Sequence, residues 1–116
     1  MKSSSILVRW QVEGVHRWVG CNIDKVSYLK DYHRHVFYFE ARISVDELDR
    51  ELEFISIQHQ LVRFANSMLE DPVDVSCEML ADATVDYLCK EYGSHRSYTV
   101  TVLEDNENGG IVSWNL

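Results

Sequence analysis

The chain of 116 residues has a single proline, five glycines and few positive charges. Its 11 Lys and Arg residues are outnumbered by 19 Asp and Glu, which gives a net charge of −8 at pH 7 with histidine neutral. This balance disfavours nucleic acid as the main partner, because recognition of a phosphate backbone requires a concentrated positive surface. A phosphorylated small molecule held by a few local cations remains compatible with it.

The sequence also lacks a run of about 18 to 20 apolar residues, the length that crosses a membrane. Met1 to Ser5 is not followed by the apolar block and small-residue cleavage site of a leader. We therefore expect a cytoplasmic protein that has no membrane partner. Cys21, Cys77 and Cys89 are an odd set without CxxC spacing, which predicts free thiols rather than a disulfide scaffold.

No repeat, linker or low-complexity segment divides the sequence, so we expect a single domain over residues 1–116. Alternating apolar and polar residues predict a half-buried strand from Ile6 to Glu13 and a longer one from His33 to Val45. Gly14 to Tyr32 has no clear period and is expected to be a long loop. After a turn, Arg50 to Ile55 is expected to form a short strand that pairs back on the previous one.

Two helices are predicted in the middle of the chain. Apolar residues at helical spacing from Ile57 to Met68 indicate an amphipathic helix of about four turns, which Pro72 interrupts. Ser76 is a suitable N-cap for the second helix, with Glu78 near the positive end of its dipole. Gly93 suits the end of that helix.

The last part of the chain returns to strand patterns. Ser97 to Glu104 and Ile111 to Trp114 are predicted strands, and Asn106 to Gly110 is the predicted turn between them. We therefore expect an α+β fold, in which an antiparallel four-stranded sheet carries two helices on one face in the order ββααββ.

The most informative motif is His33-Arg34-His35, at the start of the second predicted strand. Residues two apart on a strand point to the same face, so the two imidazoles can converge on one ion. His16, at the end of the preceding strand pattern, is a third candidate. Three histidines with an open position are typical of a catalytic zinc site. The alternative is that these histidines are exposed to solvent and bind nothing.

Five short motifs follow in order along the chain: "EGVHRW" with His16, "HRHVFYFEARISV" with His33 and His35, Glu53-Phe54 in "ELEFISIQHQL", Ser76-Cys77-Glu78 in "VSCEMLADATVDYL", and Glu104 in "YTVTVLED". Together with the order of the elements, they resemble the 6-pyruvoyl and 6-carboxy tetrahydropterin synthases of the tunnelling (T-fold) superfamily. The resemblance runs through most of the chain.

The resemblance implies a T-fold domain in which the three histidines bind zinc. Glu104 would accept two hydrogen bonds from the amino group and ring N–H of a pterin or guanine-like edge of a purine- or pterin-type ligand. Ser76 and Glu78 are implied as further ligand-binding residues. Members of the family join their sheets side by side into barrels, with ligand sites between subunits, so a homo-oligomer is implied as well.

One set of strand residues would then form the polar inner wall of the barrel: Tyr38, Glu40, Arg42, Thr99 and Thr101. The alternative is a sheet face that is open to solvent, which antiparallel sheets tolerate.

The chain departs from the family at its catalytic positions. Leu29 stands where the enzymes carry a catalytic Cys, four residues before the first His of the pair, and "MLEDPVDV" between the helices lacks their Asp-His relay. General acid–base catalysis requires a titratable group within hydrogen-bond reach of the reacting proton. Cys21 and Asp31 are the remaining catalytic candidates, whereas His59 is expected to be a surface or packing residue.

Three functions follow from these patterns, and whether the chain is an enzyme stays open. We favour a protein that binds a purine- or pterin-type nucleotide between subunits without normal synthase turnover, and so sequesters it. The second is a zinc-dependent tetrahydropterin synthase or lyase with a rearranged catalytic residue. The third is a structural or interaction module without a ligand. Four cations near the site are candidates for phosphate contacts: Arg17, Lys25, Lys30 and Arg34.

Overall fold

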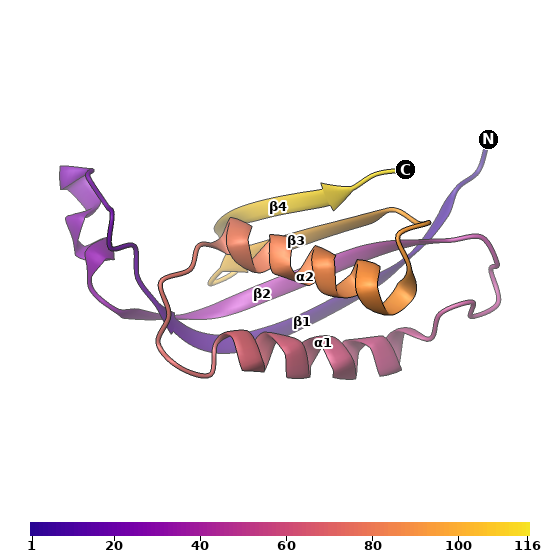
Figure 1. Ribbon diagram of the computed structural model, residues 1–116, viewed down its shortest axis with the longest axis horizontal. Helices are drawn as coiled ribbons and strands as arrows, with labels where there is room; N and C mark the ends of the chain where they lie inside the picture. The colour runs from indigo at the N-terminus through magenta and orange to yellow at the C-terminus, as the bar shows by residue number, and fades with distance from the viewer.

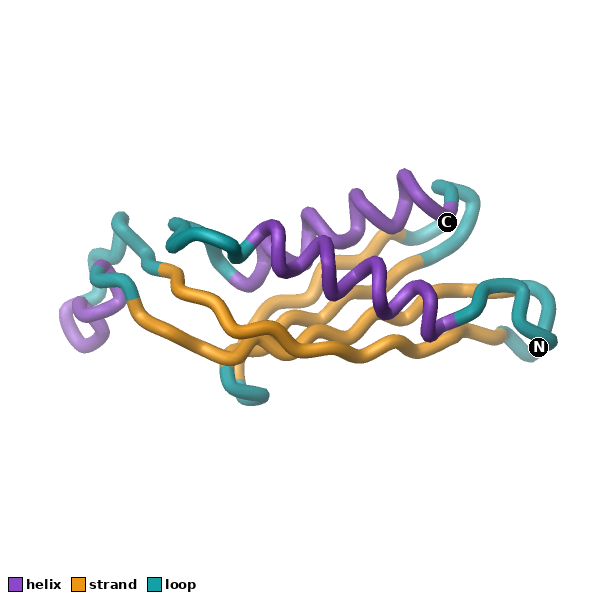
Figure 2. Tube along the Cα trace, turned by 90° about the horizontal axis from the view of Figure 1, so that it is seen from below, coloured by secondary structure: helices purple, strands orange, loops and turns teal.

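Four strands form one open antiparallel sheet in the order β1-β2-β3-β4, and the computed structural model describes all residues from 1 to 116. The elements are β1 (Ser4–His16), the 3-10 helix η1 (Asp24–Lys30), β2 (His33–Val45), α1 (Phe54–Met68), α2 (Cys77–Tyr92), β3 (Tyr98–Glu104) and β4 (Asn108–Trp114). Both α-helices lie on one face of the sheet (Figure 1), as the view from below shows clearly (Figure 2). The predicted α+β fold with an antiparallel four-stranded sheet is therefore confirmed. None of the helices has the length and apolar character required to span a membrane.

The hydrophobic core lies between the sheet and the helices. The alternation that predicts the strands also selects the residues that face the helices, and these are buried. Trp10 of β1 stacks on Phe39 of β2, its partner in the register, with 5.1 Å between the ring centroids. The main contributors from the sheet are Val8, Trp10, Val12, Phe37, Phe39, Ala41, Ile43, Tyr98, Val100 and Val102. The helices contribute Ile57, Leu61, Ala65, Leu80, Ala81, Val85 and Leu88.

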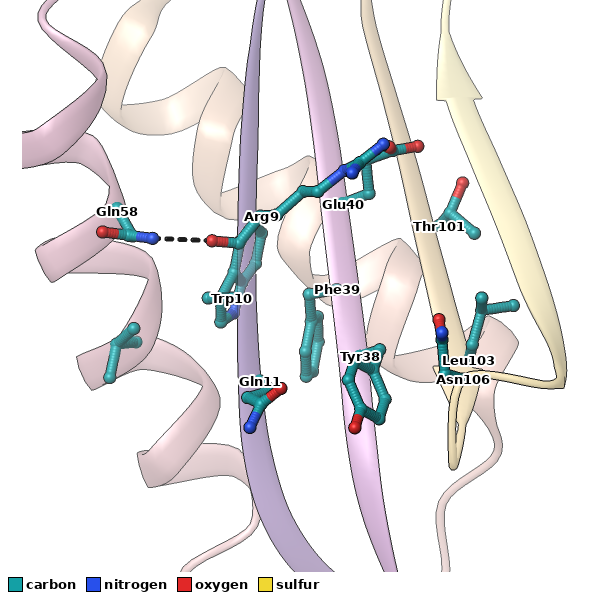
Figure 3. A pocket seen from close by; sticks show the side chains of 11 residues that line it. Arg9, Trp10, Gln11, Tyr38, Phe39, Glu40, Gln58, Thr101, Leu103 and Asn106 are labelled. Atoms are coloured by element: carbon teal, nitrogen blue, oxygen red, sulfur yellow. Dashed lines mark hydrogen bonds and ion pairs between the residues drawn. The ribbon is translucent and has the colours of Figure 1, made fainter.

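The opposite face of the sheet carries no helix and has the polar side chains predicted for it. A hollow of about 800 Å³ is bordered on this side by Arg9, Gln11, Tyr38, Glu40, Thr101 and Leu103, and its wall also includes Trp10, Phe39 and, from α1, Gln58 and Val62. Figure 3 shows the Arg9 side chain reaching across β2 to Glu40, with which it forms an ion pair of 2.9 Å. This face therefore carries charged and hydroxyl groups, in contrast to the helix-covered face.

The predicted loop from Gly14 to Tyr32 is wrong at both its start and its middle. Gly14 to His16 continue β1, because they pair with the first residues of β2, and residues 24–30 form η1. Gly14 is buried at this point, and a Cβ there would lie 3.0 Å from Leu69 Cδ2 and 3.1 Å from Phe37 Cε2. Because Gly14 has no side chain, the end of β1 can pack close against Leu69 and Phe37. The composition of the segment does not reveal this contact.

The predicted strand from Arg50 to Ile55 is also wrong, because local side-chain bonds favour a turn and an early helix start. Glu53 is the N-cap of α1, and its carboxylate accepts hydrogen bonds from the backbone N–H groups of Ile55 and Ser56 at 2.6 and 3.0 Å. A carboxylate at this position satisfies donors that have no partner inside the helix. The predicted helix itself is confirmed.

The β3–β4 hairpin is tighter than predicted. Asp105 and Asn106 have positive φ angles of 52° and 61°, and Glu107 N–H donates to the Glu104 carbonyl at 2.9 Å. This is a type I′ turn, which suits Asp and Asn, so β4 begins at Asn108 and not at Ile111. A Cβ on Gly110 would lie 2.9 Å from the backbone nitrogen of Glu78, so this glycine lets β4 pack against the first turn of α2.

The ends of α2 agree with the sequence. Ser76 caps it by accepting from Met79 N–H at 3.1 Å, and Gly93 ends it with a φ of 100°.

Glu51 provides a test of the segment that replaces the predicted strand. Its carboxylate accepts from the backbone N–H groups of Glu47 and Asp46 and pairs with Arg96 at 2.7 Å. The bond from Glu47, then Arg96, then the bond from Asp46 lower the pKa of Glu51 from 4.5 to about 2. The stability contributed by this carboxylate is therefore present above pH 4.5 and is lost as the pH falls toward 2.

We expect Glu51→Gln to unfold at a lower urea concentration than the wild type at pH 7. The difference in midpoint should shrink when the pH is lowered below 4.5, since the Glu51 carboxylate of the unfolded wild type is then protonated and unfolding takes up a proton. Glu47→Gln is the control, because only the backbone of Glu47 takes part in these bonds. A difference that is the same at pH 7 and pH 3.5 would contradict this account.

Candidate metal centre and its pocket

The three predicted histidines meet on the helix-covered face of the sheet, beyond the end of the hydrophobic core. The β1–β2 register pairs His16 with His33 and Gly14 with His35. One ring nitrogen of each histidine lies within 4.8 Å of those of the other two. The sequence prediction that these residues converge is confirmed, and the group can hold a metal ion.

The histidine rings are oriented by bonds on their outer nitrogens. Each Nδ1 pairs with an oxygen: His16 with the Val75 carbonyl at 2.7 Å, His33 with the Asp31 carbonyl at 2.8 Å, and His35 with Asp105 Oδ2 at 2.7 Å. Carbonyl and carboxylate oxygens only accept, so each Nδ1 carries a proton and donates it. The lone pair is then left on Nε2, and in metal sites this outer bond is what orients the ligand.

All three Nε2 atoms are buried and have no hydrogen-bond partner in the protein. A single buried polar atom without a partner costs about 1 to 3 kcal/mol, so three that face one another require an explanation. Burial lowers the pKa of His16 below its usual 6.5, since the charged imidazolium is disfavoured there. A neutral imidazole is the form that binds a metal.

Glu104, at the end of β3, points to the same place. Its Oε1 lies 3.2 Å from His16 Nε2 and its Oε2 lies 3.3 Å from His35 Nε2, outside hydrogen-bond geometry. With bonds of about 2.0–2.1 Å, neighbouring ligand atoms of a tetrahedral zinc are about 3.3 Å apart. Glu104 therefore lies within reach of a bound metal or of a molecule that is bound to it.

A pocket of about 560 Å³ adjoins the histidines. His16 and His33 form part of its wall, together with the three residues predicted to bind a ligand, namely Ser76, Glu78 and Glu104. Ser76 and Glu78 belong to the start of α2, which the close approach of β4 holds over the end of β3. The structure thus brings the predicted metal ligands and the predicted binding residues into one site.

Cys77 is a pocket residue that the sequence analysis did not assign. It is buried, and its thiol donates to Glu104 Oε1 at 3.8 Å. Burial, and then the charges of Glu104 and Glu78, raise the pKa of Cys77 to about 12, so the thiol stays protonated. In the sequence, the indication of this pocket position is that Cys77 lies between Ser76 and Glu78 in the helix-start motif.

Asp105 was missed as well, although it directly follows Glu104. Its two carboxylate oxygens accept from His35 Nδ1 at 2.7 Å and from Val36 N–H at 3.0 Å. These two bonds, the first from His35, lower the pKa of Asp105, so the group is ionised at neutral pH. Asp105 therefore fixes one metal-ligand candidate from behind.

The two catalytic candidates lie differently from the histidines. Cys21 is buried, and its thiol contacts the carbonyls of Val26 and Ile23 in its own loop, at 3.5 and 3.8 Å. Asp31 offers His33 only its backbone carbonyl. Neither residue lines the pocket, whereas Leu29 does.

Of the four cations considered for phosphate contacts, Arg17 alone lines the pocket. Arg34 points to the other side of β2 and pairs with Glu13. His59, expected to be a surface or packing residue, is exposed on α1.

We expect the purified protein to hold one zinc ion per chain and His33→Ala to lose it.

Asp105→Asn should lower the affinity for zinc about 10- to 100-fold, because a bond that orients a ligand is weakened. Asn tolerates the left-handed backbone at this position, so the turn is preserved. Competition with a chromophoric chelator measures the affinity, and Asp82→Asn on the exposed side of α2 is the matched control. Equal affinities for Asp105→Asn and the control would contradict the orienting role.

The chain matches no protein-family model and no curated protein. Its own residues and their geometry therefore provide the basis for a function.

Proposed function

We propose that this chain is a divergent T-fold protein, similar to the tetrahydropterin synthases, that holds zinc and binds a purine- or pterin-type nucleotide without normal synthase turnover. The observation that carries the proposal is the set of three buried Nε2 atoms without partners, on His16, His33 and His35. Binding of the nucleotide would sequester it. The open antiparallel sheet with two helices on one face is compatible with the T-fold.

Zinc is the metal that these ligands suit best. Imidazoles are borderline ligands that favour zinc among the abundant divalent ions, and zinc accepts three of them with one further position. When bound, zinc would act as a Lewis acid toward an oxygen or nitrogen of the ligand. Glu104 lies near enough to two of the histidines to contact either that ligand or the metal.

The pocket supports a ligand with hydrogen-bond donors. The Glu104 carboxylate faces it and accepts only a long bond from the Cys77 thiol, so it has acceptor capacity left for an amino group and a ring N–H. A volume of about 560 Å³ lies in the usual range of sites for small molecules and nucleotides. Guanine-like and pterin edges offer this donor pair.

The absence of turnover is inferred from the groups that face the pocket. Leu29 cannot transfer a proton, and the Cys77 thiol, with a pKa of about 12, is a poor base at neutral pH. Ser76 is engaged in capping α2, and Cys21 faces its own loop. The pocket therefore keeps recognition groups, and the chain lacks the catalytic Cys and the Asp-His relay of the enzymes it resembles.

We further propose that the chain forms a homo-oligomer through its sheet, with the pocket completed between subunits. The outer edges of β1 and β4 have no strand partner in the single chain. Such edges are usually covered or paired in stable proteins. The uncovered face of the sheet, with the part of the hollow of Figure 3 that lies on it, would then line the inside of a barrel.

We expect Glu104→Ala to keep its zinc and to bind guanosine about 10- to 100-fold more weakly than the wild type, because a charged acceptor is lost. Calorimetry on the zinc-loaded proteins measures the affinity, and Glu107→Ala in the same turn is the control. Retained guanosine affinity would contradict the recognition role of Glu104. Loss of zinc together with guanosine would make Glu104 a metal ligand instead.

The zinc-dependent synthase is tested separately. Incubation of the zinc-loaded protein with dihydroneopterin triphosphate, followed by mass spectrometry, is expected to return the compound unchanged, since the chain lacks the catalytic Cys and the Asp-His relay of the enzymes. Formation of a tetrahydropterin product would overturn the proposal and favour the enzyme. Repeating the reaction with Cys21→Ala and Asp31→Asn would then show which residue substitutes for the missing one.

A further inference from the structure

Residues 17–32 form an arm that projects beyond the end of the sheet, at the left of Figure 1. The two sides of the arm are joined by a hydrogen bond from Trp18 N–H to the Leu29 carbonyl at 2.7 Å. Cys21 is buried inside the arm, where its thiol contacts two backbone carbonyls of the same segment. The arm therefore presents a preformed surface, which lowers the cost of ordering it when a partner binds.

The outside of the arm is apolar and carries cations without partners. Lys25 and Lys30, at the two ends of η1, are exposed and take part in none of the ion pairs of the chain. Three cations and two carboxylates give the arm a charge of +1, in a chain whose net charge is −8. Exposed apolar patches mark interaction sites. Five large apolar side chains of the arm are exposed: Trp18, Val19, Ile23, Tyr28 and Tyr32.

The opposite end of the molecule has an acidic segment, residues 46–55, which runs from the end of β2 into the first turn of α1. Five carboxylates and one arginine give this segment a charge of −4. The side chains of Asp46 and Glu47 are exposed and form no ion pair. Leu48 is 87% exposed, and Phe54 and Ile55 are exposed beside it. This surface is thus apolar like the arm and opposite to it in charge.

The arm and the acidic segment do not meet within one chain. They lie at the two ends of its longest dimension, which is 49 Å, on the left and the right of Figure 1. Chains with a net charge of −8 repel one another, and so would a chain and an anionic lipid surface. The contact between a basic arm and an acidic segment is the approach of two copies in which opposite charges face each other.

We propose that the arm of one copy docks on the acidic segment of a second copy, with Lys25 and Lys30 facing Asp46 and Glu47. The exposed apolar side chains of both surfaces are buried between these charges. Because two different surfaces meet, the contact is heterologous, and each pair keeps one free arm and one free acidic segment. Association therefore continues beyond a pair. The contact is distinct from the proposed pairing of sheet edges and does not rest on the proposed function.

Exchange of the charges tests which surfaces meet. Sedimentation in about 0.05 M salt, where charges are little screened, should show wild-type assemblies that grow with protein concentration. Lys25→Glu with Lys30→Glu should raise the dissociation constant at least about tenfold, and so should Asp46→Lys with Glu47→Lys. A chain that carries all four substitutions should associate as the wild type does, because the charges are then exchanged across the same contact. Unchanged circular dichroism shows that each variant is folded.

The apolar part of the contact and the total charge are controlled separately. Leu48→Ser should weaken association at about 0.5 M salt as well, where charge pairs are screened. Arg63→Glu with Lys90→Glu makes the same change in net charge on the exposed sides of α1 and α2, and it should weaken association much less than the arm variant. Equal weakening by these two pairs of substitutions would mean that only the total charge matters and would contradict the proposed contact.

Three further results would overturn the inference. Association that the exchange at Asp46 and Glu47 leaves unchanged would assign the arm to a contact with another arm. A fourfold variant that stays dissociated would show that the two surfaces do not face each other. A wild type that does not grow with concentration has no such contact, and its binding to phosphatidylserine vesicles would assign the arm to a lipid surface. If the sheet edges pair as proposed, the resulting ring is the unit that associates, and a ring without further growth overturns this inference alone.

Discussion

The register of β1 against β2 is the constraint on which both the core and the site depend. Thirteen residue pairs run from Ser4 opposite Val45 to His16 opposite His33. Because side chains alternate between the faces of a sheet, a slip of one residue would turn the apolar side chains of β1 and its His16 to the other side. The same hydrophobic burial that fixes the register therefore also brings His16 beside the histidines of β2. The packing of the core therefore also aligns the two strands for the three metal-ligand candidates.

The helix-covered face of the sheet changes from apolar to polar beyond the helices, next to the β1–β2 and α1–α2 connections. Phe37 packs edge-on against His16, with 5.1 Å between their centroids, so the apolar core continues up to the ligands. This contact with the core keeps water from one side of the His16 imidazole and favours its neutral form. On the third strand, Glu104 follows the strand alternation into the site, whereas Asp105 adopts the left-handed conformation and reaches His35 from behind. Two successive carboxylates thus take different positions because the hairpin turn begins between them.

The sequence was sufficient for features that depend on local period and insufficient for those that depend on distant contacts. Alternation predicted β2 from His33 to Val45 and the common face of its two histidines, and capping residues predicted α2. The extension of β1 required knowledge that Gly14 lies beneath Leu69, and the turn at Glu51 required Arg96, 45 residues away. Cys77 and Asp105 gain their roles only from contacts across the fold. The T-fold assignment, the nucleotide and the oligomer come from resemblance and stay predictions.

The arrangement of the pocket explains why binding is favoured over catalysis in the proposed function. Catalysis requires contacts that strengthen in the transition state, and for proton transfer this means a group that changes its protonation state near neutral pH. The histidines have their outer nitrogens committed to fixed acceptors, and the thiol of Cys77 is held as a donor to Glu104. In the proposed function these fixed contacts hold a bound molecule, which is what a protein that retains its ligand requires.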